Sequence, residues 1–131
     1  YQHVLEPLSV YLTIAARQTA DASLVGAWNV GPDDADCVTT GELADIFCRA
    51  WGDGVRWQTH ADGGPHEAHF LKLDCSKIKS ELGWEPHWHI AEAVEKTVEW
   101  AKAWEQGADM SAVSEGQVAA FFEEAAGRSQ T

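Results

Sequence analysis

Apolar residues recur with the period of a helix at the start of the chain and again further along. Leu5, Leu8 and Leu12 lie three to four residues apart, and Glu6 and Pro7 suit the first turn of such a helix. The sequence predicts five helices: one near the start, one over residues 39–52, one over 76–82, one from about 90 to 105, and one beginning between Ser114 and Gln117.

The ends of two of these helices carry specific signals. Thr39 and Glu42 have the Thr-x-x-Glu spacing of a capping box, and Gly52 is suited to end the helix that follows. Ser76 is a good N-terminal cap for the short helix, and Gly83 should end it in a left-handed conformation. We therefore expect both helices to begin and end at these residues.

Short stretches between the helices have the composition of strands. Residues 26–30 and 55–58 are predicted strands, residues 59–67 a loop, and residues 68–73 a further extended segment. This order of elements predicts a mixed α/β (α+β) fold, helix-rich with short strands, and not a complete doubly wound sheet.

Size and charge limit the kind of protein. A chain of 131 residues and 14.3 kDa can bury one core, and 45% of its residues are apolar. We expect one part over residues 1–105 and a second over 106–131, in which a linker (106–114) precedes a terminal amphipathic helix. The formal net charge of −12 argues against a nucleic-acid partner. No apolar run reaches the roughly 18 residues that span a bilayer, and no secretory signal is recognisable, so the expected location is the cytoplasm.

A catalytic centre is not evident in the sequence. No Gly-x-Gly-x-x-Gly opens a helix after a strand, and the nearest match, Gly52-x-Gly54, is incomplete and follows a helix. No tyrosine and lysine lie one helical turn apart, and no serine or cysteine has an evident base beside it. His60, His66 and His69 invite a metal site, but His66 and His69 would share a face only in a helix, and Pro65 and the nearby glycines argue for a loop; isolated histidines explain them better.

Three motifs resemble, in order and spacing, the C-terminal portion of extended short-chain dehydrogenases/reductases that act on nucleotide sugars. They are Tyr1-Gln2-His3-Val4, Trp28-Asn29-Val30-Gly31, and residues 74–86, which run from Asp-Cys-Ser-Lys to Leu-Gly-Trp-Glu-Pro. Within that superfamily, residues 3–8, residues 65–74 and the terminal helix near Gln117 are similar to the CDP-glucose 4,6-dehydratase family. The resemblance covers Tyr1 to about Phe122.

This resemblance implies a two-part enzyme. In the family a Rossmann domain holds NAD and a Tyr/Lys pair, while the C-terminal part closes over the nucleotide and the sugar. The reaction oxidises the sugar at C4, eliminates water across C5 and C6, and returns the hydride to C6. The residues for these steps are expected upstream of Tyr1, and a chain that begins without Met is expected to be a piece of a longer product. The chain is thus expected to bind CDP-glucose, to hold no cofactor itself, to be inactive alone, and to have a Rossmann domain as its partner.

The resemblance also implies four substrate-binding residues. His3 matches a histidine that either contacts the substrate or packs at a helix entry. Asp34 lies where many relatives have an asparagine near the nucleotide, and a carboxylate there suits a ribose contact or simple solvation better than a phosphate. His66 and Glu67 match a loop that faces the ribose and diphosphate in related enzymes, although ordinary loop polarity explains them as well.

Two features leave other functions open. The arginines of the chain lie outside the loops expected near the nucleotide, which leaves the diphosphate without an arginine partner in this piece; they are Arg17, Arg49, Arg56 and Arg128. Val118, Phe121 and Phe122 could form a face for a partner or a second copy, which makes a homo-oligomer possible. The alternative to the enzyme fragment is a free-standing domain that binds a nucleotide sugar or a protein partner without catalysis.

Overall fold

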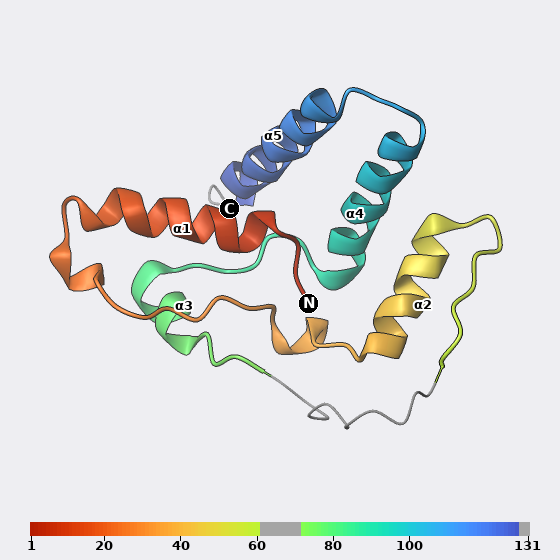
Figure 1. Ribbon diagram of the computed structural model, residues 1–131. Coiled ribbons are helices and arrows are strands. Elements are labelled where there is room, and N and C mark those ends of the chain that lie inside the picture. Colours follow the sequence, from red (N-terminus) through yellow and green to blue (C-terminus); the bar gives the residue numbers. More distant parts are fainter. Residues whose placement is uncertain (61–71, 129–131) are drawn as a thin grey trace.

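The structure is a computed structural model that describes residues 1–60 and 72–128. Its helices are α1 (Leu5–Gln18), α2 (Thr40–Trp51), α3 (Ser76–Leu82), α4 (Ile90–Glu105) and α5 (Met110–Arg128), with the 3-10 turns η1 (Ala22–Leu24) and η2 (Asp34–Asp36) (Figure 1). α4 packs against α2 on one side and against α5 on the other. None of the described helices is both long and apolar enough to cross a membrane.

The predicted mixed α/β fold is wrong. The described part of the chain contains helices and irregular segments and has neither a strand nor a sheet. Residues 26–30 and 55–58 do not form a backbone ladder with any other described segment. Of the third predicted extended segment, only residues 72–73 are described, and they are not in a strand. A strand exists only where a second segment accepts its N–H groups, which a local pattern cannot reveal.

Side chains hold residues 26–30, the first of the segments where a strand was predicted. Asn29 Nδ2 donates to the carbonyl of Asp74 at 3.0 Å. Lys77 Nζ donates to the carbonyl of Ala27 at 3.2 Å and lies 4.0 Å from the centre of the Trp28 ring. Two of the motifs that carry the family resemblance, residues 28–31 and residues 74–86, are therefore bound to one another. In this structure these contacts stabilise the fold.

Local signals set both ends of α2 and the C-terminal end of α3 as predicted. The predicted N-cap of α3 is wrong: Ser76 is the first residue of the helix, and the N-cap position is Cys75, which makes no side-chain capping bond. Thr39 Oγ1 accepts the backbone N–H of Glu42 at 3.2 Å, and a Glu42 carboxylate oxygen accepts the backbone N–H of Thr39 at 2.8 Å, which completes the capping box. Gly52 and Gly83 follow the two helices with φ of 75° and 64°, a region that glycine adopts without strain.

The last helix begins earlier than predicted. α5 begins at Met110, ahead of the expected start between Ser114 and Gln117. Asp109 caps it, because its Oδ1 accepts the backbone N–H of Ser111 at 3.0 Å. The linker between α4 and α5 therefore spans only residues 106–109.

Within residues 1–60 and 72–128, the core consists of three apolar clusters. The first joins α1 to α3, the second joins the start of α4 to α5, and the third joins α2 to α4. Their most buried members are Val10, Cys75 and Ile78 in the first, Trp88, Ala93 and Phe121 in the second, and Ile90, Val94 and Val98 in the third.

Glu6 fixes the approach to α4 from inside the core. It belongs to the first turn of α1 and is 0% exposed. Its Oε1 accepts the backbone N–H of His87 at 2.9 Å and that of Trp88 at 2.8 Å. A carboxylate is a strong acceptor for two adjacent N–H groups that are removed from water, so this contact ties the start of the chain to residues more than 80 positions later.

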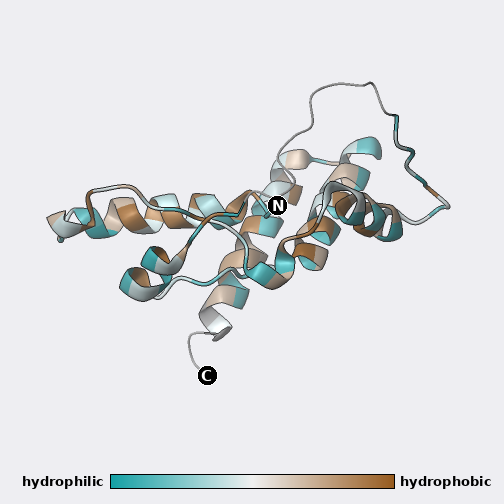
Figure 2. Cartoon of the chain, turned by 90° about the horizontal axis from the view of Figure 1, so that it is seen from below, coloured by the Kyte–Doolittle hydropathy of each residue, from teal (hydrophilic) through white to brown (hydrophobic). Residues whose placement is uncertain are grey.

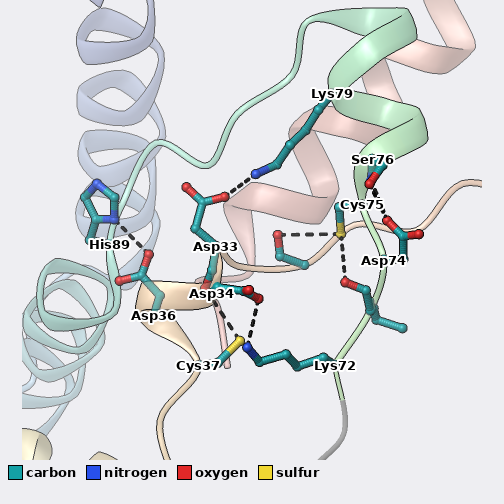
Figure 3. Close-up of polar contacts among 12 residues, drawn as sticks. Asp33, Asp34, Asp36, Cys37, Lys72, Asp74, Cys75, Ser76, Lys79 and His89 are labelled. Carbon is teal, nitrogen blue, oxygen red and sulfur yellow. Dashed lines mark hydrogen bonds and ion pairs between the residues drawn. The ribbon is translucent and has the colours of Figure 1, made fainter.

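Asp36 makes a similar contact with Ile90, two residues after Trp88. This buried residue of η2 accepts the backbone N–H of Ile90 through Oδ1 at 2.9 Å, and its Oδ2 lies 2.7 Å from His89 Nδ1 (Figure 3). It therefore satisfies an N–H group of the first turn of α4 and places a carboxylate at the positive end of that helix.

Candidate substrate-binding cleft

A polar cleft of about 570 Å³ lies between the loop at residues 32–35 and the residues that lead into α3. Its far wall is formed by residues 73–76, and Lys79 of α3 closes one side. The two walls approach closely because Gly31 is buried: a Cβ at this position would lie 3.4 Å from Cys75 Sγ and 3.5 Å from Leu73 Cβ. Glycine is therefore the residue that lets the two segments form one cleft.

Two ion pairs connect the walls of the cleft (Figure 3). Lys72 Nζ lies 2.9 Å from Asp34 Oδ1, and Lys79 Nζ is paired with Asp33 Oδ1. The hydrogen bond to Asp34 raises the pKa of Lys72 above its ordinary value, and the hydrogen bond to Asp33 does the same for Lys79. Both lysines are therefore cationic at neutral pH.

The wall at α3 is ordered by Asp74. Its Oδ1 accepts both the hydroxyl of Ser76 at 2.6 Å and the backbone N–H of Ser76 at 2.9 Å. These bonds, the hydroxyl bond first, lower the pKa of Asp74 below its ordinary value, so the residue is an acceptor at neutral pH. Burial raises the pKa of the neighbouring Cys75 thiol, which suits packing and not nucleophilic attack.

The cleft is suited to a ligand with several hydroxyl groups. Carboxylate oxygens accept hydrogen bonds from hydroxyls, and lysine ammonium groups donate to hydroxyl or phosphate oxygens. Three carboxylates, Asp33, Asp34 and Asp74, face two ammonium groups, Lys72 and Lys79, in and beside the cleft. This balance favours a sugar or ribose over a bare phosphate. Among the described residues, no three side chains of His, Cys, Asp or Glu come together as a metal site.

The predicted site residues fall in different places. Asp34 lies on the cleft, and its side chain is 87% exposed. His3 does not: it is buried at 8% exposure, its ring packs edge-on against Trp88 with a centroid distance of 4.8 Å, and its Nδ1 accepts the backbone N–H of Leu5 at 3.3 Å. His66 and Glu67 lie outside the described residues.

His3 lines two smaller pockets. One of about 370 Å³ is formed by α4, α5 and the start of the chain, and the other, of about 210 Å³, lies between α2 and α4. Burial, followed by the charge of Lys96, lowers the pKa of His3 below its ordinary value, so the imidazole is neutral at pH 7. The two roles left open for His3 both stay predictions, because its ring packs against Trp88 and also lines the two pockets.

Sequence reasoning missed the two lysines of the cleft. Lys79 lies three residues after Ser76, so the two residues share the face of α3 that lines the cleft. Lys72 lies two residues before Asp74 and pairs with Asp34 across 38 positions of the chain. A lysine ammonium group can pair with a diphosphate as an arginine can, and the three-residue spacing of Ser76 and Lys79 is the sequence signal for a cation on this face of α3.

Comparison with known proteins finds a similar enzyme. The chain is 43% identical over 123 residues to CDP-glucose 4,6-dehydratase of Salmonella typhimurium, a match that takes in 93% of this chain and 34% of that protein. The predicted resemblance is confirmed, and the matched portion is a C-terminal fragment of the relative. The chain thus spans about a third of the length of the relative. No protein-family model matches it.

Proposed function

We propose that this chain is the substrate-binding part of a nucleotide-sugar 4,6-dehydratase, that its substrate is CDP-glucose, and that it has no activity alone. The observation that carries this proposal is the 43% identity to a CDP-glucose 4,6-dehydratase across 93% of the chain. The chain spans only a third of that relative, which supports a division of labour in which another part of the enzyme performs the chemistry.

The polar cleft supports a role in binding the nucleotide sugar. Asp34 is exposed at its edge and can accept a hydrogen bond from a ribose or sugar hydroxyl, while Lys79 and Lys72 can donate to the same hydroxyl oxygens or to a phosphate. The resemblance adds Glu67 as an acceptor for the ribose hydroxyls and His66 as a donor to the diphosphate. His3, the fourth residue that the resemblance implies for substrate binding, lies outside this cleft, where it packs against Trp88 and lines the two smaller pockets.

NAD, which the resemblance implies for the complete enzyme, does not fit the residues described here. A dinucleotide phosphate is bound where a glycine-rich loop opens a helix. Gly52 and Gly54 instead follow the C-terminal end of α2, where helix carbonyls and a negative dipole end would repel a phosphate. We assign NAD, together with the Tyr/Lys pair, to the Rossmann domain expected as the partner of this chain.

A chimera tests the proposal. This chain replaces the matching C-terminal third of the S. typhimurium enzyme, and the product is assayed with CDP-glucose and NAD by NMR of the sugar nucleotide. We expect a 4-keto-6-deoxy sugar nucleotide from the chimera and none from the isolated chain. A chimera that binds NAD but neither binds nor converts CDP-glucose contradicts the proposal.

Three variants of the chimera and one control variant locate the binding residues. Asp34→Ala, His66→Ala and Glu67→Ala should each weaken binding of CDP-glucose. Asp21→Ala is the matched control, because Asp21 is an exposed carboxylate that caps η1 and lies outside the cleft. If the isolated chain binds CDP-glucose as tightly as the chimera, the alternative of a free-standing binding domain is favoured.

A further inference from the structure

The outer face of α1 carries a row of exposed apolar side chains. Val4 lies just before the helix, and Leu8, Tyr11 and Leu12 follow at helical spacing; these four residues are called the apolar stripe. Their exposed fractions are 60%, 44%, 63% and 66%. Figure 2 shows hydrophobic residues recurring along this helix. Scattered exposed apolar residues are ordinary, but a continuous row on one helix face marks a contact surface.

The opposite face of α1 is already buried in the core. A rotation of the helix that buried the apolar stripe would therefore expose that face. Glu6 is bound to the segment before α4, and Val10 packs with Cys75 and Ile78. A helix that is apolar on two faces is normally covered on both. The helix thus has one occupied and one unoccupied packing face.

A hollow continues the stripe at its N-terminal end. Val4 lines the pocket of about 370 Å³, together with Trp100 of α4 and Val118 of α5. The latter two are themselves 38% and 39% exposed. A partner that lies along the stripe can place an apolar side chain in this hollow, and buried anchors of this kind supply much of the energy of an interface.

The exposed area of the chain indicates a large uncovered surface. The total accessible area is 9173 Å², whereas a folded monomer of this mass exposes about 6,800 Å². The excess, about 2,400 Å², shows that the chain as a whole exposes more surface than a compact monomer of its mass. The four residues of the apolar stripe are part of that exposed surface.

We propose that the apolar stripe docks against the polypeptide that makes up the other two thirds of the enzyme. This inference rests on the proposed function, since the relative contains that additional polypeptide and this chain matches only 34% of it. The stripe itself contains no charged side chain, so the surface it meets is apolar.

Cysteine labelling tests the docking without any need for turnover. Leu12→Cys is introduced into the isolated chain and into the full-length chimera, and the rate of maleimide labelling is followed by peptide mass spectrometry. Peptide mapping separates the new thiol from Cys37, Cys48 and Cys75. Thr13→Cys is the matched control, because Thr13 is exposed on the same helix outside the stripe.

We expect the Leu12→Cys thiol to react about tenfold or more slowly in the chimera than in the isolated chain, because docking excludes the reagent. The Thr13→Cys thiol should react at the same rate in both. Equal rates for Leu12→Cys in both proteins overturn the docking proposal, even if the chimera converts CDP-glucose. Protection of Leu12→Cys in the isolated chain that increases with protein concentration also overturns it, because a second copy then covers the stripe.

A second variant measures the same contact through stability. Leu12→Asp should leave the melting temperature of the isolated chain close to that of Thr13→Asp, because both positions are exposed there. In the chimera it should lower the melting temperature well below that of Thr13→Asp. Equal melting temperatures of the two variants in the chimera contradict the proposal.

Discussion

Carboxylates in two regions of this molecule have opposite environments. Glu6 and Asp36 are buried and accept backbone N–H groups of the segment that enters α4. Asp33 and Asp34, which lie two or three residues before Asp36, point to the polar cleft and pair with lysines. The same side-chain chemistry therefore holds the fold in one region and remains available to a ligand in the other.

The two regions differ in the free energy that is lost when a carboxylate is removed. A buried N–H group without an acceptor costs about 1–3 kcal/mol, so removing one carboxylate that serves two of them is expensive. A solvent-exposed ion pair contributes about 0–1 kcal/mol, because water replaces either partner readily. Removing a buried carboxylate should accordingly lower the free energy of unfolding several times more than removing a carboxylate of the cleft.

The largest effect is expected for Glu6→Ala. The change removes the acceptor of two buried N–H groups and leaves a cavity in the core, so the free energy of unfolding should fall by about 3 kcal/mol or more. Urea denaturation followed by circular dichroism measures it. Glu6→Gln keeps a side-chain acceptor oxygen and should lose clearly less; equal losses would show that the hydrogen bonds to His87 and Trp88 do not matter.

Asp36→Ala should have the next largest effect, about 2 kcal/mol, because it leaves the N–H group of Ile90 without its acceptor at the start of α4. The same denaturation experiment applies. Asp34→Ala is the matched control, since Asp34 is an exposed aspartate of the same loop. A comparable loss of stability in the control would erase the distinction between the two regions.

Glu42 lies between the two cases, because it is exposed but accepts a backbone N–H group. The hydrogen bonds from Thr39, backbone first, lower the pKa of Glu42 below its ordinary value of 4.5. A carboxyl with a lowered pKa in the folded state stabilises the fold fully above pH 4.5, and this contribution is lost as the pH falls through the lowered pKa. The difference in stability between the wild-type chain and Glu42→Gln should therefore shrink on acidification below pH 4.5. A difference that does not change with pH contradicts this role.

The smallest effect on stability is expected for Lys79→Ala. Lys79 and Asp33 are 40% and 35% exposed, so their pair should contribute less than about 1 kcal/mol. In the chimera the same change should weaken binding of CDP-glucose, because it removes a donor from the cleft. A large loss of stability would contradict this and show that Lys79 holds the fold, as Glu6 and Asp36 do.

Local signals explain which parts of the fold could be predicted from sequence. The capping box of Thr39 and Glu42 and the left-handed Gly83 depend on neighbours within a few residues, and the structure confirms both. The cap at Asp109 was missed because a stronger-looking Ser-x-x-Gln pattern follows it at Ser114.

Long-range partners explain what could not be predicted. Residues 26–30 have the composition of a strand, but no described segment forms backbone–backbone hydrogen bonds with them. The roles of Glu6 and Lys79 depend on partners at His87, Trp88 and Asp33, which lie 46 or more positions away. The cleft itself was predicted only at Asp34, through the family resemblance.

Calorimetric titration of CDP-glucose into the NAD-loaded chimera tests the central claim most directly. The proposed function predicts saturable binding that Asp34→Ala weakens and that Asp21→Ala leaves unchanged. A folded chimera that gives no saturable heat with CDP-glucose would contradict it.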